Sequence, residues 1–435
     1  MNQQIDEESM HIERAILVGV LLDDMYEEDY RMSMEELGNL AEACFMEVVG
    51  RVEQRLDVPN KALYIGPGKL QEVKRTFEAK DGDVVIFDNT LSPMQIRNIQ
   101  KELGCPVMDR TGLILEIFES RARSREARLQ VEVAKLQYML PRLVGLHEAL
   151  SRQGGGSGSR SNKGAGEKKL ELDKRRLEHR LTQFKRELSE VKKERITQRK
   201  KRADSGDLRV ALVGYTNAGK STLMNTMISM FYKDGGASEE KAVFEKDMLF
   251  ATLDTTVRRI EPKDHQKFLL SDTVGFISNL PHNLVEAFHS TLEEAIESDV
   301  LIHVVDYSDD NHLEQIRVTE KTLKELGADG IPVIYVYNKA DKCMKMDGLP
   351  KILGNRIYMS AKMKIGIDEL LTLIENVLED MFCEGRFVLP YSEGGVLSYM
   401  NDKGVVISTS YEEDGIYVKA KLRKTDFERY KNYLV

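Results

Sequence analysis

The chain has 435 residues, which is too long for one ordinary core, so we expect two to four domains. Hydrophobic residues make up 41% and charged residues 31%, and no run of eighteen apolar residues occurs, so a membrane span is excluded. The net charge of −9 excludes a protein that binds polyanions over its whole surface.

The beginning of the chain, MNQQIDEESMHIER, is polar and acidic, which excludes a secretory signal. The four cysteines lie far apart without a CxxC pair, so neither a disulfide framework nor a structural zinc site is expected. These features predict a cytoplasmic protein, because the cytosol keeps thiols reduced. The cysteines are Cys44, Cys105, Cys343 and Cys383.

Strands and helices alternate in the first part of the chain. AILVGVLL (15–22) predicts a buried strand, and residues 33–49 predict an amphipathic helix with Ser33 as its N-cap. The alternation predicts a small parallel-sheet α/β domain over residues 1–120. Its later elements are a segment at 51–57, a helix after Gly68, a strand at 83–88, a helix opened by Ser92-Pro93 and a strand at 105–108.

Residues 121–203 carry apolar side chains at steps of four and three on both sides of a Gly/Ser stretch, GGGSGSRSNKGAG (154–166). This spacing predicts an antiparallel helical hairpin with a flexible tip. Pro141 is expected to kink or end the first helix. The seam residues are Leu129, Val133, Leu136, Leu140 and Leu143 before the tip, and Leu177, Leu181, Phe184, Leu188 and Val191 after it.

The second helix of this hairpin is strongly basic. Residues 160–202 hold seventeen lysines and arginines against seven acidic residues, a local net charge of +10. Such a helix can neutralise the phosphates of an RNA in a salt-sensitive manner. The alternative is a solvated linker that spaces two domains, but the seam residues on both sides of the tip favour a rigid arm.

The strand and helix alternation returns over residues 204–383, with about six strands, and this segment is predicted to be a P-loop domain. Residues 384–435 alternate apolar and polar side chains and predict a small β-rich or α/β module. The expected fold class is therefore multidomain α/β. The strand segments of the P-loop domain include LRVALVG, KFLLSD, VLIHVVD, PVIYVYN and RIYMSA.

GYTNAGKS (214–221) fits the pattern GxxxxGK[ST], follows a predicted strand and opens a predicted helix. The glycines let backbone N–H groups surround phosphate oxygens at the N-terminus of the helix. Lys220 would neutralise the β- and γ-phosphates, and the Ser221 hydroxyl would bind Mg²⁺. A chance Gly-rich turn is the alternative, and the strand–loop–helix context disfavours it.

DTVG (272–275) follows the strand KFLLS. Asp272 is expected to hold the hydration shell of Mg²⁺, and the Gly275 N–H can bond the γ-phosphate and respond to its loss. A plain turn is the alternative for DxxG taken alone. Its place after the P-loop and after the appropriate strand favours the nucleotide-binding interpretation.

NKAD (338–341) and SAK (360–362) each end a predicted strand. The Asp341 carboxylate can accept from guanine N1–H and N2–H₂, a pair of donors that adenine lacks. Asn338 is expected to tie this loop to the P-loop, Lys339 to stack over the base, and the Ala361 N–H to reach guanine O6. In this order after a P-loop, the two motifs predict specificity for GTP and GDP.

FATLDTT (250–256) lies between the P-loop and DTVG, where the first switch segment is expected. A threonine hydroxyl there completes Mg²⁺ coordination while the γ-phosphate is present. Thr252, Thr255 and Thr256 are all candidates, and a solvated turn is the alternative for any two of them.

Together the motifs give the following predicted GTP-binding residues: Gly214, Tyr215, Thr216, Asn217, Ala218, Gly219, Lys220, Ser221, Phe250, Ala251, Thr252, Leu253, Asp254, Asp272, Thr273, Val274, Gly275, Asn338, Lys339, Ala340, Asp341, Ser360, Ala361 and Lys362.

These motifs, together with YIGPGK (64–69), DRTGLILEIFESRA (109–122) and EARLQVEVAKLQYMLPRL (126–143), resemble the HflX family of ribosome-associated GTPases over nearly the whole chain. The resemblance implies that Thr252 is the Mg²⁺-binding threonine. It also implies a monomer that binds the large ribosomal subunit through rRNA and splits 70S ribosomes, with the hairpin tip directed toward the peptidyl-transferase region. The chain departs from the family in Thr255, where proline is common, and in its longer tip without proline.

The hydrolytic residue is not predicted. Phe276 stands where a water-positioning glutamine is found in Ras-like proteins, so hydrolysis is expected to be slow alone and stimulated by the ribosome. Asn217 either holds a K⁺ ion near the phosphates or simply caps the loop. Lys69 in GPGK either contacts a second nucleotide or rRNA, or lies in a surface turn, which is favoured.

Three functions compete at this point. The first is a Mg²⁺-dependent GTPase that splits or rescues ribosomes. The second is a GTP-gated assembly or RNA-binding factor without splitting activity. The third is a tRNA-modifying GTPase, which requires a catalytic partner domain or cofactor site that the N-terminal segment does not indicate.

Overall fold

The computed structural model describes residues 12–152, 160–204, 208–231, 249–250, 253–263, 265–278, 284 and 292–435. By its internal contacts the chain divides into two compact units. Unit 1 comprises Met1–Val191 together with two short segments from later in the chain, Lys246–Asp254 and Ile277–Ser290. Unit 2 comprises Lys192–Glu245, Thr255–Phe276 and Thr291–Val435.

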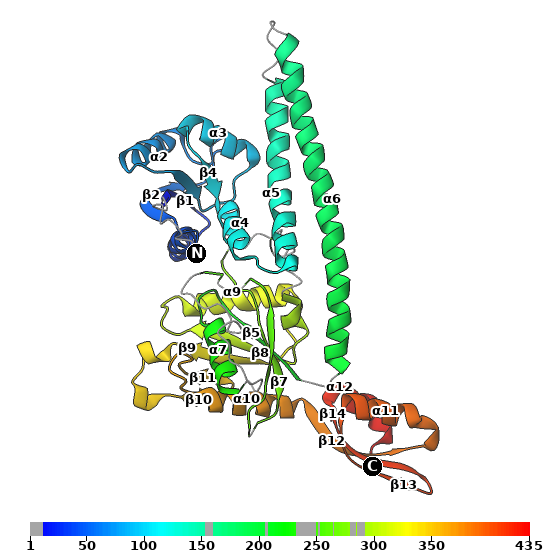
Figure 1. Ribbon diagram of the computed structural model, residues 1–435. Coiled ribbons are helices and arrows are strands. Elements are labelled where there is room, and N and C mark those ends of the chain that lie inside the picture. The colour runs from blue at the N-terminus through cyan, green and yellow to red at the C-terminus, as the bar shows by residue number, and fades with distance from the viewer. Residues whose placement is uncertain are drawn as a thin grey trace, which may run out of the picture. The chain divides into compact units, whose positions relative to one another are not determined.

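Unit 1 contains a four-stranded parallel sheet of order β2-β1-β3-β4 (Figure 1). The central strands β1 and β3 are apolar on both faces because helices cover both. Ile16 and Val18 of β1 pack with α2 and α3, whereas Ala15 and Leu17 face the other layer. The elements are β1 (Arg14–Leu22), α1 (Glu27–Ala43), β2 (Glu47–Leu56), α2 (Pro67–Ala79), β3 (Val84–Phe87), α3 (Pro93–Leu103), β4 (Val107–Asp109) and α4 (Arg110–Arg121).

The predicted parallel sheet is confirmed, but the predicted start of the first helix is wrong. Helix α1 begins at Glu27, so Ser33 lies inside it, and residues 47–49 belong to β2. The Ser33 hydroxyl donates to the Asp88 carboxylate at 2.7 Å, so this buried serine serves a tertiary contact and not a cap. Ser92 does cap α3, through a reciprocal pair of bonds with Gln95.

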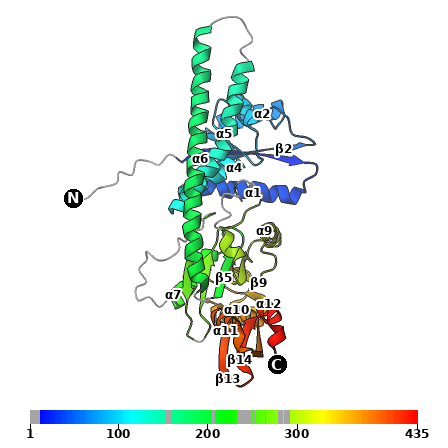
Figure 2. The same cartoon turned by 90° about the vertical axis from the view of Figure 1, so that its right-hand side faces the viewer.

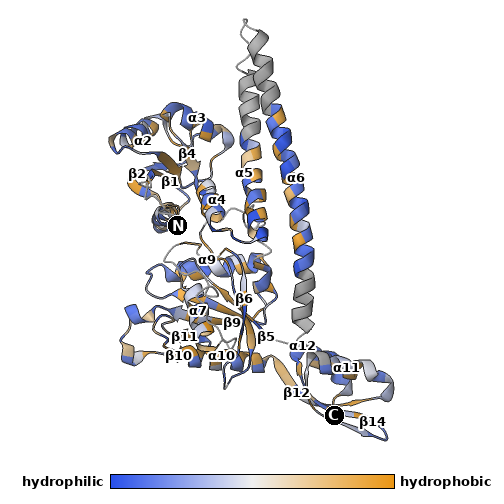
Figure 3. Cartoon of the chain, viewed as in Figure 1, coloured by the Kyte–Doolittle hydropathy of each residue, from blue (hydrophilic) through white to orange (hydrophobic). Residues whose placement is uncertain are grey.

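The predicted hairpin is formed by α5 (Arg125–Arg152) and α6 (Arg160–Asp204), which run side by side in Figures 1 and 2. Ion pairs join Arg125 to Glu187 at 3.7 Å and Glu132 to Arg180 at 3.7 Å, a register that only antiparallel helices allow. Figure 3 colours the described part of α6 mostly hydrophilic, with hydrophobic residues at intervals. Its seam residues are half-buried, as a two-helix seam requires.

Two expectations about the hairpin need correction. Helix α5 continues through Pro141, where the guanidinium of Arg142 donates to the Tyr138 carbonyl at 2.7 Å and strengthens the turn that the proline weakens. Helix α6 already begins at Arg160, so residues 160–166 of the predicted flexible tip are helical. The remaining tip residues up to 159 lie outside the described part of the chain.

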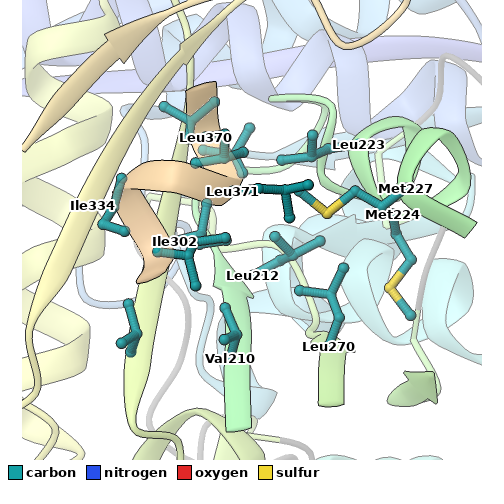
Figure 4. Close-up of a cluster of buried hydrophobic side chains, with 14 of the residues drawn as sticks. Val210, Leu212, Leu223, Met224, Met227, Leu270, Ile302, Ile334, Leu370 and Leu371 are labelled. Atoms are coloured by element: carbon teal, nitrogen blue, oxygen red, sulfur yellow. The ribbon is translucent and has the colours of Figure 1, made fainter. Parts of the chain in front are cut away.

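Unit 2 contains a seven-stranded sheet of order β10-β11-β9-β8-β5-β7-β6, parallel except for its edge pairs β10-β11 and β6-β7. Figure 4 shows its core, in which Leu212 and Ile302 of the central strands meet Leu223 and Met227 of α7 and Leu371 of α10. The elements are β5 (Leu208–Val213), α7 (Lys220–Phe231), β6 (Thr256–Ile260), β7 (Phe268–Asp272), β8 (Val300–Asp306), α9 (His312–Glu325), β9 (Val333–Asn338), β10 (Lys351–Leu353), β11 (Arg356–Tyr358) and α10 (Ile367–Asp380).

The end of unit 2 is a three-stranded antiparallel sheet, β12-β14-β13, packed on two helices. Phe387, Val418 and Leu422 alternate with exposed or half-exposed residues along the strands and form its core with Met400 and Tyr430. The elements are β12 (Phe382–Leu389), α11 (Gly394–Lys403), β13 (Val405–Glu412), β14 (Gly415–Arg423) and α12 (Lys424–Arg429).

The expected multidomain α/β fold class is therefore confirmed. Among the residues that the structure describes, no helix is long and apolar enough to cross a membrane. The division into four domains at residues 120, 203 and 383 stays a prediction.

Candidate nucleotide-binding site

The predicted P-loop connects β5 to α7. Gly214 has φ +143°, and a Cβ there would lie 2.2 Å from the Val304 carbonyl oxygen, so only glycine fits. Gly219 has φ +96° and approaches Asn338 equally closely. Asn217, with φ +58°, is exposed on the same loop. The loop conformation thus requires its glycines, and α7 begins where its N–H groups can face an anion.

Lys220 is the first residue of α7 and only 6% exposed. Its ammonium donates to the carbonyl oxygens of Gly214 at 2.9 Å and Tyr215 at 2.7 Å, which holds it across the loop. Burial lowers the pKa of Lys220 to about 8, and the negative charge of Asp272 partly offsets this effect. A phosphate group beside this ammonium would stabilise its charged form.

Ser221 and Asp272 supply the oxygens expected for Mg²⁺. The Ser221 hydroxyl donates to the Asp272 carboxylate at 2.8 Å, and Asp272 is fully buried at the end of β7. A hydroxyl and a carboxylate beside a phosphate site suit this hard cation, which prefers oxygen ligands. Of the predicted first-switch residues, Ala251 and Thr252 lie outside the described residues, so the third expected ligand is not placed.

The DTVG segment lies against the P-loop. A Cβ at Gly275 would be 2.8 Å from the Thr216 Cα and 3.0 Å from the Lys220 ammonium, so this glycine is close to where a γ-phosphate would sit. The next residue, Phe276, pairs its backbone with the loop: Thr216 N–H donates to its carbonyl at 2.8 Å, and its N–H donates to Gly214 at 3.1 Å. The Thr273 hydroxyl donates to the β5 carbonyl of Leu212 at 2.7 Å.

The side chain of Phe276 is 2% exposed and packs among Ala211, Val213, Leu292 and Ala295. It is therefore a core residue, which agrees with the expectation that it cannot orient water. Val274, two residues before Phe276, is also buried.

NKAD and SAK meet at the carboxyl ends of β9 and β11. Asn338 donates to the Ala218 carbonyl at 3.0 Å and accepts from Ala361 N–H at 3.0 Å, so one amide ties both motifs to the P-loop. The structure thus pairs the Ala361 N–H, which was expected to reach guanine O6, with Asn338. Asp341 lies half-buried in a short 3₁₀ turn (Ala340–Lys342) at the same edge.

Lys339 forms a link that the sequence only partly indicated. Its ammonium donates to the Asn217 carbonyl at 2.8 Å and to the Asp306 carboxylate at 2.8 Å. Asp306, at the end of β8, was not among the predicted site residues. Asp306 could have been recognised from the sequence, because it is an acidic residue at the end of an apolar strand. The carboxyl end of that strand lies at the same sheet edge as Lys339. The remaining predicted residues, buried Ala340 and Ser360 and exposed Lys362, lie around this edge.

Of the described first-switch residues, Phe250, Leu253 and Asp254 belong to unit 1, whereas Thr255 and Thr256 belong to unit 2, where Thr256 is the first residue of β6. The rings of Phe250 and Phe118 meet edge to face with centroids 4.7 Å apart. Asp254 accepts from the backbone N–H groups of Arg123 at 3.2 Å and Ser124 at 3.0 Å, and also from the Ser124 hydroxyl. Leu253, which lies between Phe250 and Asp254 in the sequence, is buried.

Lys69 of the GPGK segment lies in the first turn of α2 and pairs with Glu72 at 2.7 Å. It is therefore on a helix and not in a surface turn. Its contact with a second nucleotide or RNA stays untested.

Three family models match the chain in sequence. They are described as GTP-binding GTPase N-terminal, GTP-binding GTPase Middle Region and 50S ribosome-binding GTPase, and they match residues 31–119, 121–202 and 209–339.

Similar proteins extend the likeness over nearly the whole chain. The GTPase HflX of Caldanaerobacter subterraneus subsp. tengcongensis is 44% identical over 423 residues, which cover 97% of this chain and 94% of the relative. The GTPase HflX of Alkalihalophilus pseudofirmus is 41% identical over 403 residues, covering 92% and 91%. A GTP-binding protein of Sulfolobus solfataricus, solved in complex with GDP, is 25% identical, covers 85% of this chain and 99% of its own, and superposes with a TM-score of 0.43. By its likeness to these two HflX relatives over more than nine tenths of its length, the chain belongs to the HflX family of GTPases and is an enzyme that hydrolyses GTP.

Proposed function

We propose that this GTPase binds the large ribosomal subunit and couples GTP binding and hydrolysis to the splitting or rescue of 70S ribosomes. The observation that carries the proposal is the presence, in one chain, of a guanine-nucleotide site and a long basic two-helix arm. The match of residues 209–339 to a family described as 50S ribosome-binding GTPase supports the choice of partner.

The arm has the charge that an rRNA contact requires. Between residues 171 and 195, α6 exposes Arg175, Arg176, Arg180, Lys185 and Arg186, while its leucine seam turns toward α5. Arg175, Arg176 and Arg186 pair with acids on their own helix at 3.3–3.7 Å. Phosphates of rRNA can replace such exposed contacts at little cost. Binding should then weaken steeply with salt.

The proposed cofactor is Mg²⁺, held by Ser221 and the hydration shell that Asp272 orders, with Thr252 as a further ligand. Bound there, the cation would neutralise charge on the β- and γ-phosphates. Asn217 is exposed on the loop with φ +58°, which leaves its side chain available to a K⁺ ion, so K⁺ stimulation is proposed beside the simpler role of a loop residue.

Hydrolysis is proposed to be slow without the ribosome. Phe276 stands where Ras-like GTPases have a water-positioning glutamine. Its side chain is buried among apolar residues and cannot orient a water molecule. The ribosome would then order the catalytic residues or supply the charge that stabilises the transition state. For a function on ribosomes, we expect the protein to be monomeric and cytoplasmic.

Sucrose-gradient sedimentation of purified 70S ribosomes with the protein tests the proposal. With GTP or a non-hydrolysable analogue, we expect free subunits to appear and the protein to migrate with the large subunit, whereas GDP should leave 70S ribosomes intact. GTP-dependent binding without subunit separation would favour an assembly or RNA-binding factor. Lack of binding in any nucleotide state would overturn the proposal.

A further inference from the structure

Helix α4 (Arg110–Arg121) of unit 1 contacts both segments that respond to the nucleotide in a GTPase. The chain passes between unit 2 and unit 1 directly after Asp254 in the first switch and directly before Ile277, behind DTVG. At each junction, a switch segment therefore contacts the N-terminal sheet domain.

Ser278 is held at the N-terminal end of α4 by a buried ion pair between Glu36 and Arg110. The Arg110 guanidinium donates to the Ser278 carbonyl at 3.1 Å. The Glu36 carboxylate accepts from the Ser278 N–H at 3.3 Å and also from the Ser278 hydroxyl. The carbonyl, the amide and the hydroxyl of one residue are thus all bound by the two members of this pair.

The pair itself is fixed within the sheet domain. Arg110 also donates to Asp88 at 2.7 Å, and both groups bond Ser33 of α1, at 3.2 and 2.7 Å. Arg110 is 2% exposed, Asp88 6% and Glu36 7%. Breaking such a buried charge network leaves an uncompensated charge, which costs several kcal/mol, so Ser278 is held by a rigid support.

The other end of the same helix holds the first switch. Phe118, two turns along α4 from Arg110, packs its ring on Phe250 at 4.7 Å. The turn that follows α4 binds the Asp254 carboxylate through Arg123 and Ser124. One short helix and its following turn therefore engage both switches.

The chain between DTVG and Ser278 is short. Only Phe276 and Ile277 separate Gly275 from Ser278, and Phe276 is bonded to the P-loop on both its N–H and its carbonyl. Each residue spans at most about 3.6 Å, so a fixed Ser278 leaves Gly275 little freedom. Gly275 then stays beside Lys220, where its N–H can meet a γ-phosphate.

We infer that α4 positions both switch segments, and that Glu36 and Arg110 are positioning residues that hold Gly275, through Ser278, in the place where it binds the γ-phosphate. GDP has no γ-phosphate and gains nothing from this placement. GTP does, so the pair should contribute to the preference for GTP over GDP and to kcat, without contributing to the affinity for GDP.

The test compares the Kd of GDP with the Kd of a non-hydrolysable GTP analogue, and kcat, in Ser278→Ala and Glu36→Gln. We expect the analogue to bind about tenfold more weakly in each variant, for the loss of a charge-assisted bond, with kcat lower and GDP binding unchanged. Glu119→Gln is the matched control, because Glu119 lies on the same helix and pairs with Lys135 on its exposed side. It should leave all three quantities unchanged.

Ser278→Ala removes one hydroxyl and leaves the Glu36–Arg110 pair intact, so it tests the inference even where Glu36→Gln destabilises the fold. A double variant should lose little beyond the stronger single variant if the two residues act together. An unchanged ratio of the two affinities in Ser278→Ala, or equal losses for GDP and the analogue, would overturn the inference. The assay contains no ribosome, so its outcome does not depend on the proposed ribosomal function.

Discussion

Lys220 combines a position that phosphate binding requires with an environment that disfavours its charge. Its side chain is buried, and burial lowers its pKa to about 8. Bound phosphates would restore the charge, so the pKa must be higher in the complex. The affinity for nucleotide is then fully present below about pH 8 and is lost as the pH rises above it, because binding must take up a proton.

We therefore predict that the affinity for GDP falls about tenfold between about pH 7 and about pH 9. The measurement is a titration of Kd by calorimetry in buffers of different ionisation enthalpy, kept below the pH at which guanine itself ionises. Proton uptake on binding should grow over the same range. A constant Kd with no proton uptake would show that Lys220 stays charged without the nucleotide.

Asp341 should determine the choice of base. Asp341→Asn replaces the acceptor for guanine N2–H₂ by an amide donor, and xanthine presents a carbonyl at that position. We predict that the variant loses GTP affinity by about 100-fold and gains XTP binding, since an unmatched polar group is strongly rejected. Competition binding of GTP and XTP measures the change. Asp347→Asn, at an exposed aspartate nearby, is the control, and a variant of Asp341 that still prefers GTP would refute the role.

The residues of the nucleotide site were predictable because each motif is local and its chemistry depends on a few adjacent residues. The network of Ser33, Glu36, Asp88 and Arg110 was not, because its members come from three distant segments and only folding brings them together. A charged residue opening the apolar run TGLILEIF was the one available signal at Arg110.

Among the elements, α5 is tied to the sheet domain by Asp109, the N-cap of α4. This fully buried carboxylate accepts four bonds, from Leu91 N–H, Gly112 N–H, the Tyr138 hydroxyl and the Arg142 guanidinium, at 2.6–3.0 Å. Burial and the Asp109 charge both raise the pKa of Tyr138. The arm is thereby fastened to α4, the helix that also engages both switches.

Asp109→Asn should loosen this attachment, because an amide has one acceptor oxygen for four donors. We predict that the opening free energy of α5 falls by about 3 kcal/mol, read as faster hydrogen exchange over residues 125–142. Glu119→Gln breaks only an exposed pair and should cost less than about 1 kcal/mol. Equal protection of α5 in both variants would contradict the anchoring role.

The sequence predicted most elements but not all of their ends. The apolar periodicity of residues 33–49 was compatible with a helix starting at Ser33, yet acidic residues at Glu27 and Glu28 begin the helix earlier, where they suit its N-terminal dipole. Pro141 was expected to interrupt α5, but neighbouring contacts of Arg142 with Tyr138 and Asp109 maintain the helix. The start of α1 was therefore visible in the local sequence, whereas the continuation of α5 depends on a tertiary contact that local patterns do not contain.

At the scale of the whole molecule, three contacts matter most for the proposed function. Gly275 lies beside Lys220, Ser278 is held by Arg110 of α4, and α4 shares Asp109 with α5 of the arm. The central claim of the proposed ribosome action is that the arm is the part of the molecule that contacts rRNA.

The most direct measurement follows 70S dissociation by light scattering with the wild-type protein and with a variant in which residues 154–166 are replaced by two glycines. The variant retains the nucleotide site and the seam but has a shorter arm. We predict that scattering falls with GTP for the wild-type protein and stays constant for the variant, while both bind GTP with the same Kd. An equal fall in scattering with the shortened arm would contradict the claim that the arm acts on the ribosome.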